Sequence, residues 1–192
     1  MPNPSLELTA TSRALGPRGS QCHLPLRGPS ALPVSAAQLK RWAPQMPLLH
    51  MRAATSEDLA LTYAITEDAM RDYVEETWGM WDADEQLEKH RTNFTPETYK
   101  ILLIEDEVAG LVAVEEFPSH VWLVKLYLLA KHRGQGVGSQ VLKSVQETAR
   151  AQGKPVTLRV LRVNKRAQSL YAKHGFKVTE ENAERLHMAS GA

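Results

Sequence analysis

The chain has 192 residues, which is long enough for one domain with a substantial hydrophobic core. Hydrophobic residues make up 43% and charged residues 23%, as is usual for a soluble globular protein, and the formal net charge of +1 gives no bulk electrostatic reason to expect nucleic-acid or membrane binding. No apolar run approaches the roughly 18 residues of a transmembrane helix, and the single cysteine, Cys22, excludes an internal disulfide framework, so we expect a cytoplasmic protein.

Residues 1–47 differ in composition from the rest of the chain. They contain eight of the eleven prolines and five of the 23 basic residues but only one acid, Glu7, which gives this segment a net charge of +4. The segment has neither the periodic hydrophobic pattern of a packed element nor the apolar stretch of a signal peptide, so we predict a disordered extension. It is alternatively upstream sequence, translated ahead of a start near Met46 or Met51.

Beyond this extension, hydrophobic periodicity and turn residues predict a regular order of strands and helices. Thr55, followed three residues later by Asp58, resembles a capping box and marks the start of the first helix, which Gly79 ends. The acidic residues 105–107 indicate a tight turn between two strands of a hairpin. The predicted strands are 48–55, 98–106, 108–117, 121–130, 155–163, 176–181 and 183–190, and the predicted helices are 55–78, 82–94, 137–152 and 164–175. This order, β-α-α-β-β-β-α-β-α-β-β, predicts a single α/β domain over residues 48–192, with a mixed sheet and helices on both faces.

The stretch from Leu123 to Gly153 runs from an apolar strand through a basic, glycine-rich turn into an amphipathic helix. The start of such a helix presents unpaired backbone N–H groups and the positive end of the helix dipole. Glycines ahead of the helix allow the backbone to approach an anion closely, and Arg133 adds a forked donor suited to phosphate oxygens. These features predict a cradle for a phosphate or a pyrophosphate.

Three kinds of glycine-rich phosphate loop can be distinguished by their spacing. The Walker loop requires Gly-Lys-Ser/Thr, which does not follow here, and the dinucleotide fingerprint requires G-x-G-x-x-G, whereas Gly134, Gly136 and Gly138 read G-x-G-x-G. Arg133, Gly136 and Gly138 instead fit (Q/R)-x-x-G-x-(G/A), the acyl-coenzyme A pyrophosphate loop of the GCN5-related N-acetyltransferase (GNAT) family, which this chain resembles. The alternative is a turn in which the glycines serve backbone geometry alone.

A second segment, at 164–176, also resembles this family. The family carries N-x-x-A-x-x-L-Y-x-x-x-G-F after the strand that follows the coenzyme helix. Every anchor of this pattern is present, at Asn164, Ala167, Leu170, Tyr171, Gly175 and Phe176. The resemblance covers roughly Met51 to Met188 and implies the GNAT fold, in which a mixed, mostly antiparallel central sheet is flanked by helices.

The resemblance also implies where acetyl-CoA would bind. The residues expected to hold its pyrophosphate, beside Arg133, are Gly134, Gln135, Gly136, Val137, Gly138 and Ser139. The backbone expected to pair with the pantetheine arm, almost as an added strand, is that of Leu126, Tyr127 and Leu128. Asn164 would reach the pantetheine through its side-chain amide, and Tyr171 would lie near the coenzyme sulfur. A phenol there can donate a proton to the departing thiolate, although the same tyrosine could be only a core aromatic.

The attacking amine must be neutral, which requires a general base or a proton-conducting water. Some members of the family place a glutamate five residues before the motif asparagine, but this chain has Arg159 there. The candidate bases are Glu115 and Glu116, of which strand alternation allows at most one to face the site. His120 and His132 could also titrate near neutrality. Each glutamate could equally be a solvated strand end, and each histidine a peripheral contact.

The acceptor side should be formed by the first two helices. Trp78 and Trp81 lie there among seven acids, namely Asp68, Asp72, Glu75, Glu76, Asp82, Asp84 and Glu85. An acidic, aromatic rim suits a cationic amine, whereas the alternative is an ordinary charged helix surface.

The sequence thus predicts an acetyl-CoA-dependent N-acyltransferase that acetylates a primary amine, on a small molecule or a peptide, by direct attack in a ternary complex. Cys22 lies in the extension, so we expect no covalent acyl-enzyme, and His90, His174 and His187 lack metal-ligand spacing, so we expect no metal. The basic extension with its lone Trp42 makes no nucleic-acid patch. The alternative is a non-catalytic acyl-CoA-binding or regulatory domain on the same fold, and a monomer and a homodimer both remain open.

Overall fold

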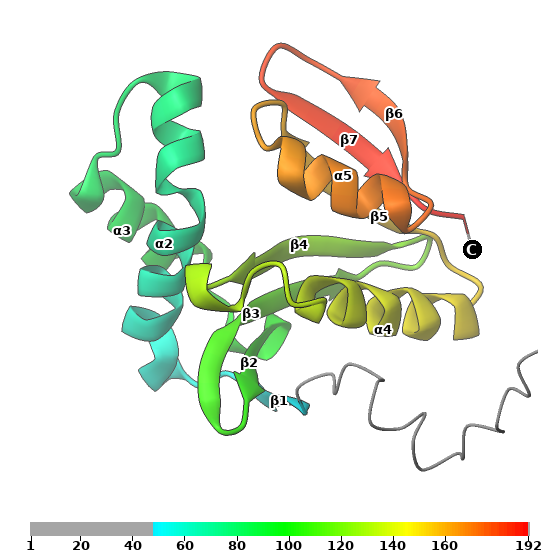
Figure 1. The fold of residues 1–192 in the computed structure, drawn as a ribbon, viewed down its shortest axis with the longest axis horizontal. Helices are drawn as coiled ribbons and strands as arrows, with labels where there is room; N and C mark the ends of the chain where they lie inside the picture. Colours follow the sequence, from blue (N-terminus) through cyan, green and yellow to red (C-terminus); the bar gives the residue numbers. More distant parts are fainter. Residues whose placement is uncertain (1–47, 192) are drawn as a thin grey trace, which may run out of the picture. The chain divides into compact units, whose positions relative to one another are not determined.

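The computed structural model describes residues 48–191, so the predicted disordered extension over residues 1–47 lies outside the described residues. The strands are β1 (Leu49–Ala53), β2 (Tyr99–Ile104), β3 (Glu107–Glu116), β4 (Val121–Leu128), β5 (Val156–Leu161), β6 (Lys177–Glu181) and β7 (Arg185–Ala189). The helices are α2 (Leu59–Trp78), α3 (Ala83–Asn93), α4 (Val137–Ala151) and α5 (Lys165–Lys173), with short 3-10 turns η1 (Ser56–Asp58), η2 (Pro96–Thr98) and η3 (Ala130–His132). These elements follow the predicted order, which Figure 1 traces by colour. Within the described residues, no helix is both long enough and apolar enough to span a membrane.

The seven described strands form one sheet, in the order β1-β2-β3-β4-β5-β7-β6. Every neighbouring pair is antiparallel except β4 and β5, so the predicted mixed, mostly antiparallel sheet is confirmed. The parallel pair is joined through α4, because parallel strands require a crossover connection. Glu105 and Asp106 form the turn between β2 and β3, with φ angles of 50° and 65°.

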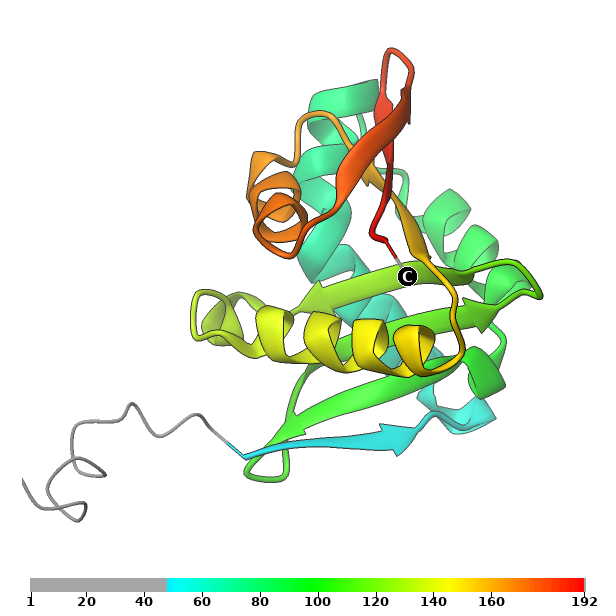
Figure 2. The same cartoon turned by 90° about the vertical axis from the view of Figure 1, so that its right-hand side faces the viewer.

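Helices cover both faces of the sheet (Figure 2). On one face, α4 and α5 pack over a buried cluster that includes Val141 and Leu158. On the other face, α2 covers a second buried cluster that includes Ile65 and Leu111. The sheet is therefore the middle layer, and the two hydrophobic cores lie on its opposite sides.

A buried carboxylate fixes the start of the first helical segment, where Thr55 and Asp58 form the predicted capping box. The backbone N–H of Thr55 donates to Asp58 Oδ2 at 2.8 Å. Arg52, at the end of β1, donates to both oxygens of the same carboxylate at 2.7 Å. These hydrogen bonds from Arg52 hold the pKa of Asp58 well below its ordinary value. The carboxylate of Asp58 therefore joins β1 to the η1 turn that leads into α2.

A bulge in β4 changes the direction of its side chains. In the pairing with β3, Ala113 lies opposite Lys125 and Val114 lies opposite Leu123, so that Val124 is the extra residue. A bulge interrupts the alternation of side chains along a strand. Lys125 consequently turns toward the face that α2 covers. Its Nζ there lies 5.1 Å from the ring centroid of Tyr99, which belongs to the core on that face.

The pairing between β4 and β5 ends just before this bulge, since it covers only Val121 to Leu123 of β4. β3 stays close to the rest of β4, and Gly110 allows this approach. A Cβ at this position would collide with the backbone carbonyl of Tyr127. β5 meanwhile leaves the edge of β4 (Figure 2). The two parallel strands thus diverge next to the start of α4.

His90 connects α3 to α2. Its Nε2 lies 2.9 Å from Thr62 Oγ1, and both side chains are buried. Its ring stacks on Phe94, with 5.6 Å between the ring centroids. Burial, with a smaller contribution from the charge of Lys125, lowers the pKa of His90 from 6.5 to about 4. The folded protein therefore holds this imidazole in its neutral form at neutral pH.

We predict that His90 makes the folded state less stable in mild acid. Between pH 6.5 and 4 the unfolded chain protonates His90 and the folded chain does not, so the free energy of unfolding should fall as the pH decreases through this window. Above pH 6.5 this histidine should have no effect on the pH dependence. Thermal unfolding followed by circular dichroism should give a lower Tm at pH 5 than at pH 7.5, and a smaller difference in His90→Gln. An identical pH dependence in the two proteins would contradict this expectation.

Candidate active site

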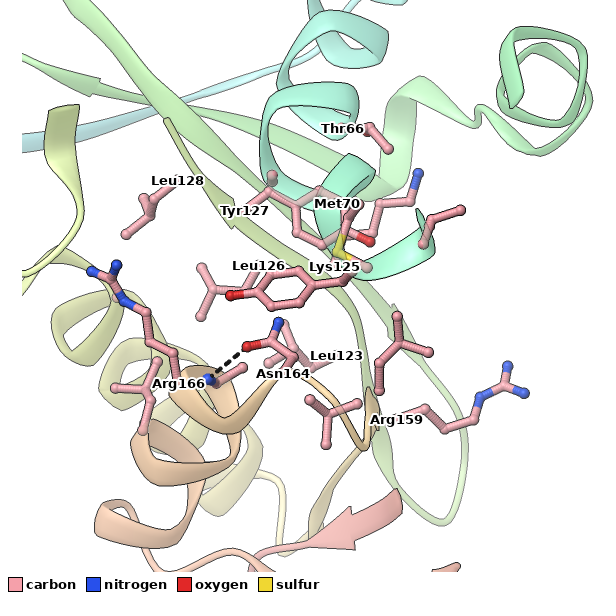
Figure 3. Close-up of a pocket in the computed structure, with 18 of the residues that line it drawn as sticks. Thr66, Met70, Leu123, Lys125, Leu126, Tyr127, Leu128, Arg159, Asn164 and Arg166 are labelled. Carbon is pink, nitrogen blue, oxygen red and sulfur yellow. Dashed lines mark hydrogen bonds between the residues drawn. The ribbon is translucent and has the colours of Figure 1, made fainter. Parts of the chain in front are cut away.

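A cavity of about 1310 Å³ lies where β4 and β5 diverge. Its walls come from α2, α3, β4, the glycine-rich turn, the end of β5, α5 and the start of β7. Figure 3 shows the β4 residues from Leu123 to Leu128 along one wall, with Asn164 at the start of α5 pointing toward that strand. The cavity therefore brings together both of the motifs that the sequence analysis identified.

The glycine-rich turn reaches the cavity at the start of α4. Gly134 and Gly136 have φ angles of 83° and 85°, which residues with a side chain rarely adopt. Gly138 lies between β4 and α5. A Cβ at this position would be 3.3 Å from a carbon of Leu170 and 3.6 Å from a carbon of Leu128. The first turn of α4 thus offers unpaired backbone N–H groups to the cavity with little side-chain bulk in front of them.

Of the six residues expected to hold a pyrophosphate, those that line the cavity are Gly134, Gly136, Gly138 and Ser139. The other two side chains point elsewhere. Val137 is buried in the core under α4, and the side-chain amide of Gln135 donates to the backbone oxygen of Lys131 at 2.7 Å. Only the backbone of these two residues is therefore available to contact an anion at this turn.

Arg133 connects the turn to α2. Its Nε donates to the backbone oxygen of Leu128 at 2.7 Å, and its Nη2 donates to Asp68 Oδ2 at 2.6 Å and to the backbone oxygen of Asp68 at 3.0 Å. The same carboxylate accepts a hydrogen bond from the backbone N–H of Ala130 at 3.2 Å. Arg133 also lines the cavity, where it contributes positive charge. Because Nε and Nη2 already donate hydrogen bonds within the protein, the side chain also holds the turn in place.

The edge of β4 that faces the cavity is open beyond the bulge. Leu126, Tyr127 and Leu128, whose backbone is expected to pair with the pantetheine arm, all line the cavity. Past Leu123, no described strand pairs with β4 on the side of β5. An open strand edge presents backbone N–H and C=O groups that an amide-containing ligand can pair with.

Asn164 and Tyr171 come from α5. Asn164 Oδ1 accepts a hydrogen bond from the backbone N–H of Ala167 at 2.9 Å, which is the cap of the helix and the dashed line in Figure 3. The side-chain NH₂ of Asn164 is left for the cavity that this residue lines. Tyr171 is 8% exposed, and its ring lies 5.7 Å from that of Phe176. Burial raises the pKa of Tyr171 to about 12, so its phenol is protonated at neutral pH and can act as a donor.

None of the four candidate bases lines the cavity. Glu115 and Glu116 are exposed at the end of β3, and Glu116 accepts a hydrogen bond from Gln152 at 3.1 Å. His120 and His132 are also outside the lining. Within the described part of the chain, no group of three or more histidine, cysteine, aspartate or glutamate side chains is placed to hold a metal ion.

The lining of the cavity is basic, which favours an ordinary charged helix surface over an acidic rim for the acids of the first two helices. Of the seven acids on the first two helices, only Glu85 lines the cavity, and it pairs with Lys89 at 2.8 Å. Trp78 and Trp81 do line the cavity, and Trp81 is buried. The cationic side chains in the lining are Lys89, Lys125, Arg133, Arg159, Arg166, Lys173 and Arg185.

Sequence reasoning missed most of these cations. Lys125 interrupts the apolar run 121–130, and Arg159 interrupts the predicted strand 155–163. A charged residue inside an otherwise apolar strand is unusual unless it is paired or functional, and this was the available signal. Arg185 gave no such signal, because it begins a short strand of mixed polarity.

The model of the acetyltransferase (GNAT) family matches residues 62–176, and a search of curated protein sequences found no match. Among solved structures, the chain is similar to the PaiA N-acetyltransferase of Thermoplasma acidophilum in complex with coenzyme A, with a TM-score of 0.63 and 17% identity over 76% of this chain and 99% of that chain. It is similar to an acetyltransferase of Thermus thermophilus, with a TM-score of 0.62 and 16% identity over 77% of this chain and 99% of that chain. It is also similar to the ribosomal-protein-S18-alanine N-acetyltransferase of Escherichia coli, with a TM-score of 0.57 and 17% identity over 75% of this chain and 94% of that chain.

Proposed function

Because this chain belongs to the GNAT family of acetyltransferases, we propose that it moves the acetyl group of acetyl-CoA to a primary amine by direct attack in a ternary complex. The observation that carries the proposal is one cavity lined by the glycine-rich turn, the open edge of β4 and Tyr171. Membership of the family makes the chain an acetyl-CoA-dependent transferase. The acceptor amine and the roles of individual residues are what we propose.

The cavity has the features that a coenzyme A thioester requires. The start of α4 offers N–H groups to a diphosphate, and Arg133 and Arg166 add positive charge. The open edge of β4 can pair with the amides of the pantetheine arm, and the free NH₂ group of Asn164 can donate to the same arm. The space between β4 and α5 depends on Gly138, since a side chain there would meet both walls.

We assign Tyr171 to the departing sulfur. When the amine nitrogen bonds to the acetyl carbonyl carbon, the carbon–sulfur bond breaks and the thiolate needs a proton, which the phenol of Tyr171 can give. Burial raises the pKa of Tyr171, so the phenol keeps its proton at neutral pH and is available to donate a hydrogen bond or a proton to the thiolate. The proton that the amine loses passes to water, and Tyr171 regains its own from water, so that charge and protons balance.

Water is also the proposed route for the first deprotonation of the amine. Glu115 and Glu116 lie outside the cavity lining, and the single lining carboxylate of the described residues, Glu85, is paired with Lys89. A carboxylate must come within hydrogen-bond reach of the proton it takes, directly or through one water. We therefore give neither Glu115 nor Glu116 a direct part in the reaction.

The variant Tyr171→Phe tests the proposed acid. It keeps the ring in the core and removes the proton donor, so kcat should fall by about 10² to 10⁴ while the Kd for acetyl-CoA stays unchanged. The measurement is thiol release from acetyl-CoA with a panel of amines, beside calorimetry of coenzyme binding. Tyr63→Phe is the matched control, because its hydroxyl donates to the Ala83 oxygen at 2.9 Å outside the cavity lining. An unchanged kcat across the pH range would remove Tyr171 from the mechanism, and binding without turnover on any amine would favour a non-catalytic acyl-CoA-binding domain.

Two substitutions of Asn164 separate its cap from its amide. Asn164→Asp keeps an oxygen that caps α5 but loses the NH₂ donor, so the Tm should be unchanged while CoA affinity falls about tenfold, the value of one lost hydrogen bond. Asn164→Ala should lose the affinity and also about 1 kcal/mol of stability with the cap. Thermal unfolding and calorimetry give both quantities for each variant. Wild-type CoA affinity in Asn164→Asp would show that the amide does not bind the coenzyme.

A further inference from the structure

Three cations of the cavity lining share one face of the sheet, away from the glycine-rich turn. They are Lys125 on β4, Arg159 on β5 and Arg185 on β7. Arg159 pairs with His187 in the β5–β7 ladder, and Arg185 lies two residues before that partner, so both arginines point to the same face as close diagonal neighbours. We refer to Lys125, Arg159 and Arg185 as the basic triad.

Each member of the basic triad rests on an aromatic ring. Lys125 Nζ lies 5.1 Å from the ring centroid of Tyr99 and 6.0 Å from that of Tyr127. The guanidinium of Arg159 lies 5.1 Å from the ring of Trp122. That of Arg185 lies 5.5 Å from the ring of Trp78, which is 45% exposed at the end of α2. The rings hold the three cations in place without neutralising them, because an aromatic face attracts a cation and accepts no charge from it.

No member of the basic triad forms a salt bridge with an acidic side chain among residues 48–191, although the exposed Glu115 lies opposite Trp122 in the pairing of β3 with β4. Lys125 is half-buried and donates no hydrogen bond to a described residue, and burial lowers its pKa to about 8. Removing an ammonium group from water without a partner is costly, and an anion beside it would offset that cost. The cavity therefore has unused binding capacity for negative charge at this end.

The diphosphate of a coenzyme does not account for the basic triad. The cations beside the glycine-rich turn are Arg133, which is paired with Asp68, and Arg166, whose Nη2 lies 3.8 Å from where a Cβ of Gly134 would be. The triad faces α2, whereas Leu126 and Leu128 of β4 pack against the cluster under α4. The bulge at Val124 produces this separation, because it turns Lys125 away from the face of α4. Two groups of cations thus occupy different parts of one cavity.

We propose that the acceptor is a small amine that also carries an anionic group, either a carboxylate or a phosphate, and that Lys125, Arg159 and Arg185 bind this group. The inference rests on the proposed function, since it names the class of acceptor for the same cavity. The forked guanidinium groups suit the two oxygens of such an anion. Binding of the anion at the triad leaves the amine end of the acceptor free to reach the thioester.

Matched amines test the class of acceptor directly. The pairs are β-alanine and β-alaninamide, glycylglycine and glycylglycinamide, and phosphoethanolamine and ethanolamine. The anionic member of at least one pair should have a kcat/KM about tenfold higher or more. The amide pairs are biased against this result, because amidation lowers the amine pKa and leaves more of the reactive neutral amine. The preferred pair tells a carboxylate from a phosphate. Equal or better turnover of every member that lacks the anionic group, or of a cationic polyamine, would overturn the proposal.

Variants of the basic triad test the site. Lys125→Met, Arg159→Gln and Arg185→Gln should each raise KM for the acceptor that carries the anionic group about tenfold, with a much smaller effect on the counterpart that lacks it. The Kd for acetyl-CoA should not change. Lys100→Met and Arg150→Gln are the matched controls, because they remove the same charges from exposed positions outside the cavity lining. A rise in the Kd for acetyl-CoA in the triad variants, with acceptor selectivity intact, would assign these cations to the coenzyme and refute the proposal.

A failure of the anion site can be told apart from a failure of the proposed acetyl transfer. If no amine is turned over, the proposed function fails, and calorimetry of the same matched pairs on the protein saturated with CoA still measures acceptor binding. The triad would be supported as an anion site if the protein bound the anionic member of a pair and bound it more weakly in Arg159→Gln. Equal binding, or no binding, of both members in every pair would reject it.

Discussion

The short pairing between β4 and β5 is the constraint on which the site depends. The two strands pair only as far as Leu123, and the bulge at Val124 follows immediately. Because Gly110 keeps β3 packed tightly on the rest of β4, the divergence appears on the other side of that strand. If β5 paired with β4 along its whole length, the backbone N–H and C=O groups of β4 would all be hydrogen-bonded and no cavity would form between the two strands. The site is thus an interruption in the middle of the sheet, stabilised by one hydrophobic cluster on each face.

The parallel relation of β4 and β5 explains why the proposed anion site lies at the same place. A crossover helix must begin where β4 ends, so the N-terminus of α4 comes next to the open part of the strand. The glycine-rich turn makes this approach possible, and Arg133 ties the turn to α2 through Asp68. Topology therefore supplies the N–H groups, and only a few side chains are needed to complete the proposed cradle.

The sequence predicts the order of elements and the two motifs well, because both depend on local patterns. Gly136 and Gly138 mark the turn, Thr55 and Asp58 mark the start of the first helix, and the anchors from Asn164 onward mark α5. The charge of the cavity could not be predicted in this way. Asp68 belongs to an acidic run in the sequence but pairs with Arg133 from a segment far along the chain. The direction of Lys125 depends on a bulge that no local pattern in β4 signals.

Calorimetric titration of the purified protein with acetyl-CoA and with S-acetylpantetheine tests the central claim most directly, that the turn at 131–138 holds the diphosphate of a thioester carrier. The two ligands share the thioester and the arm, and only acetyl-CoA has the diphosphate and the adenosine 3′-phosphate attached to it. The account predicts one bound acetyl-CoA per chain and an affinity for S-acetylpantetheine about 100-fold lower, because the charge-assisted hydrogen bonds to phosphate are lost. Equal affinities, or no binding of acetyl-CoA, would contradict it.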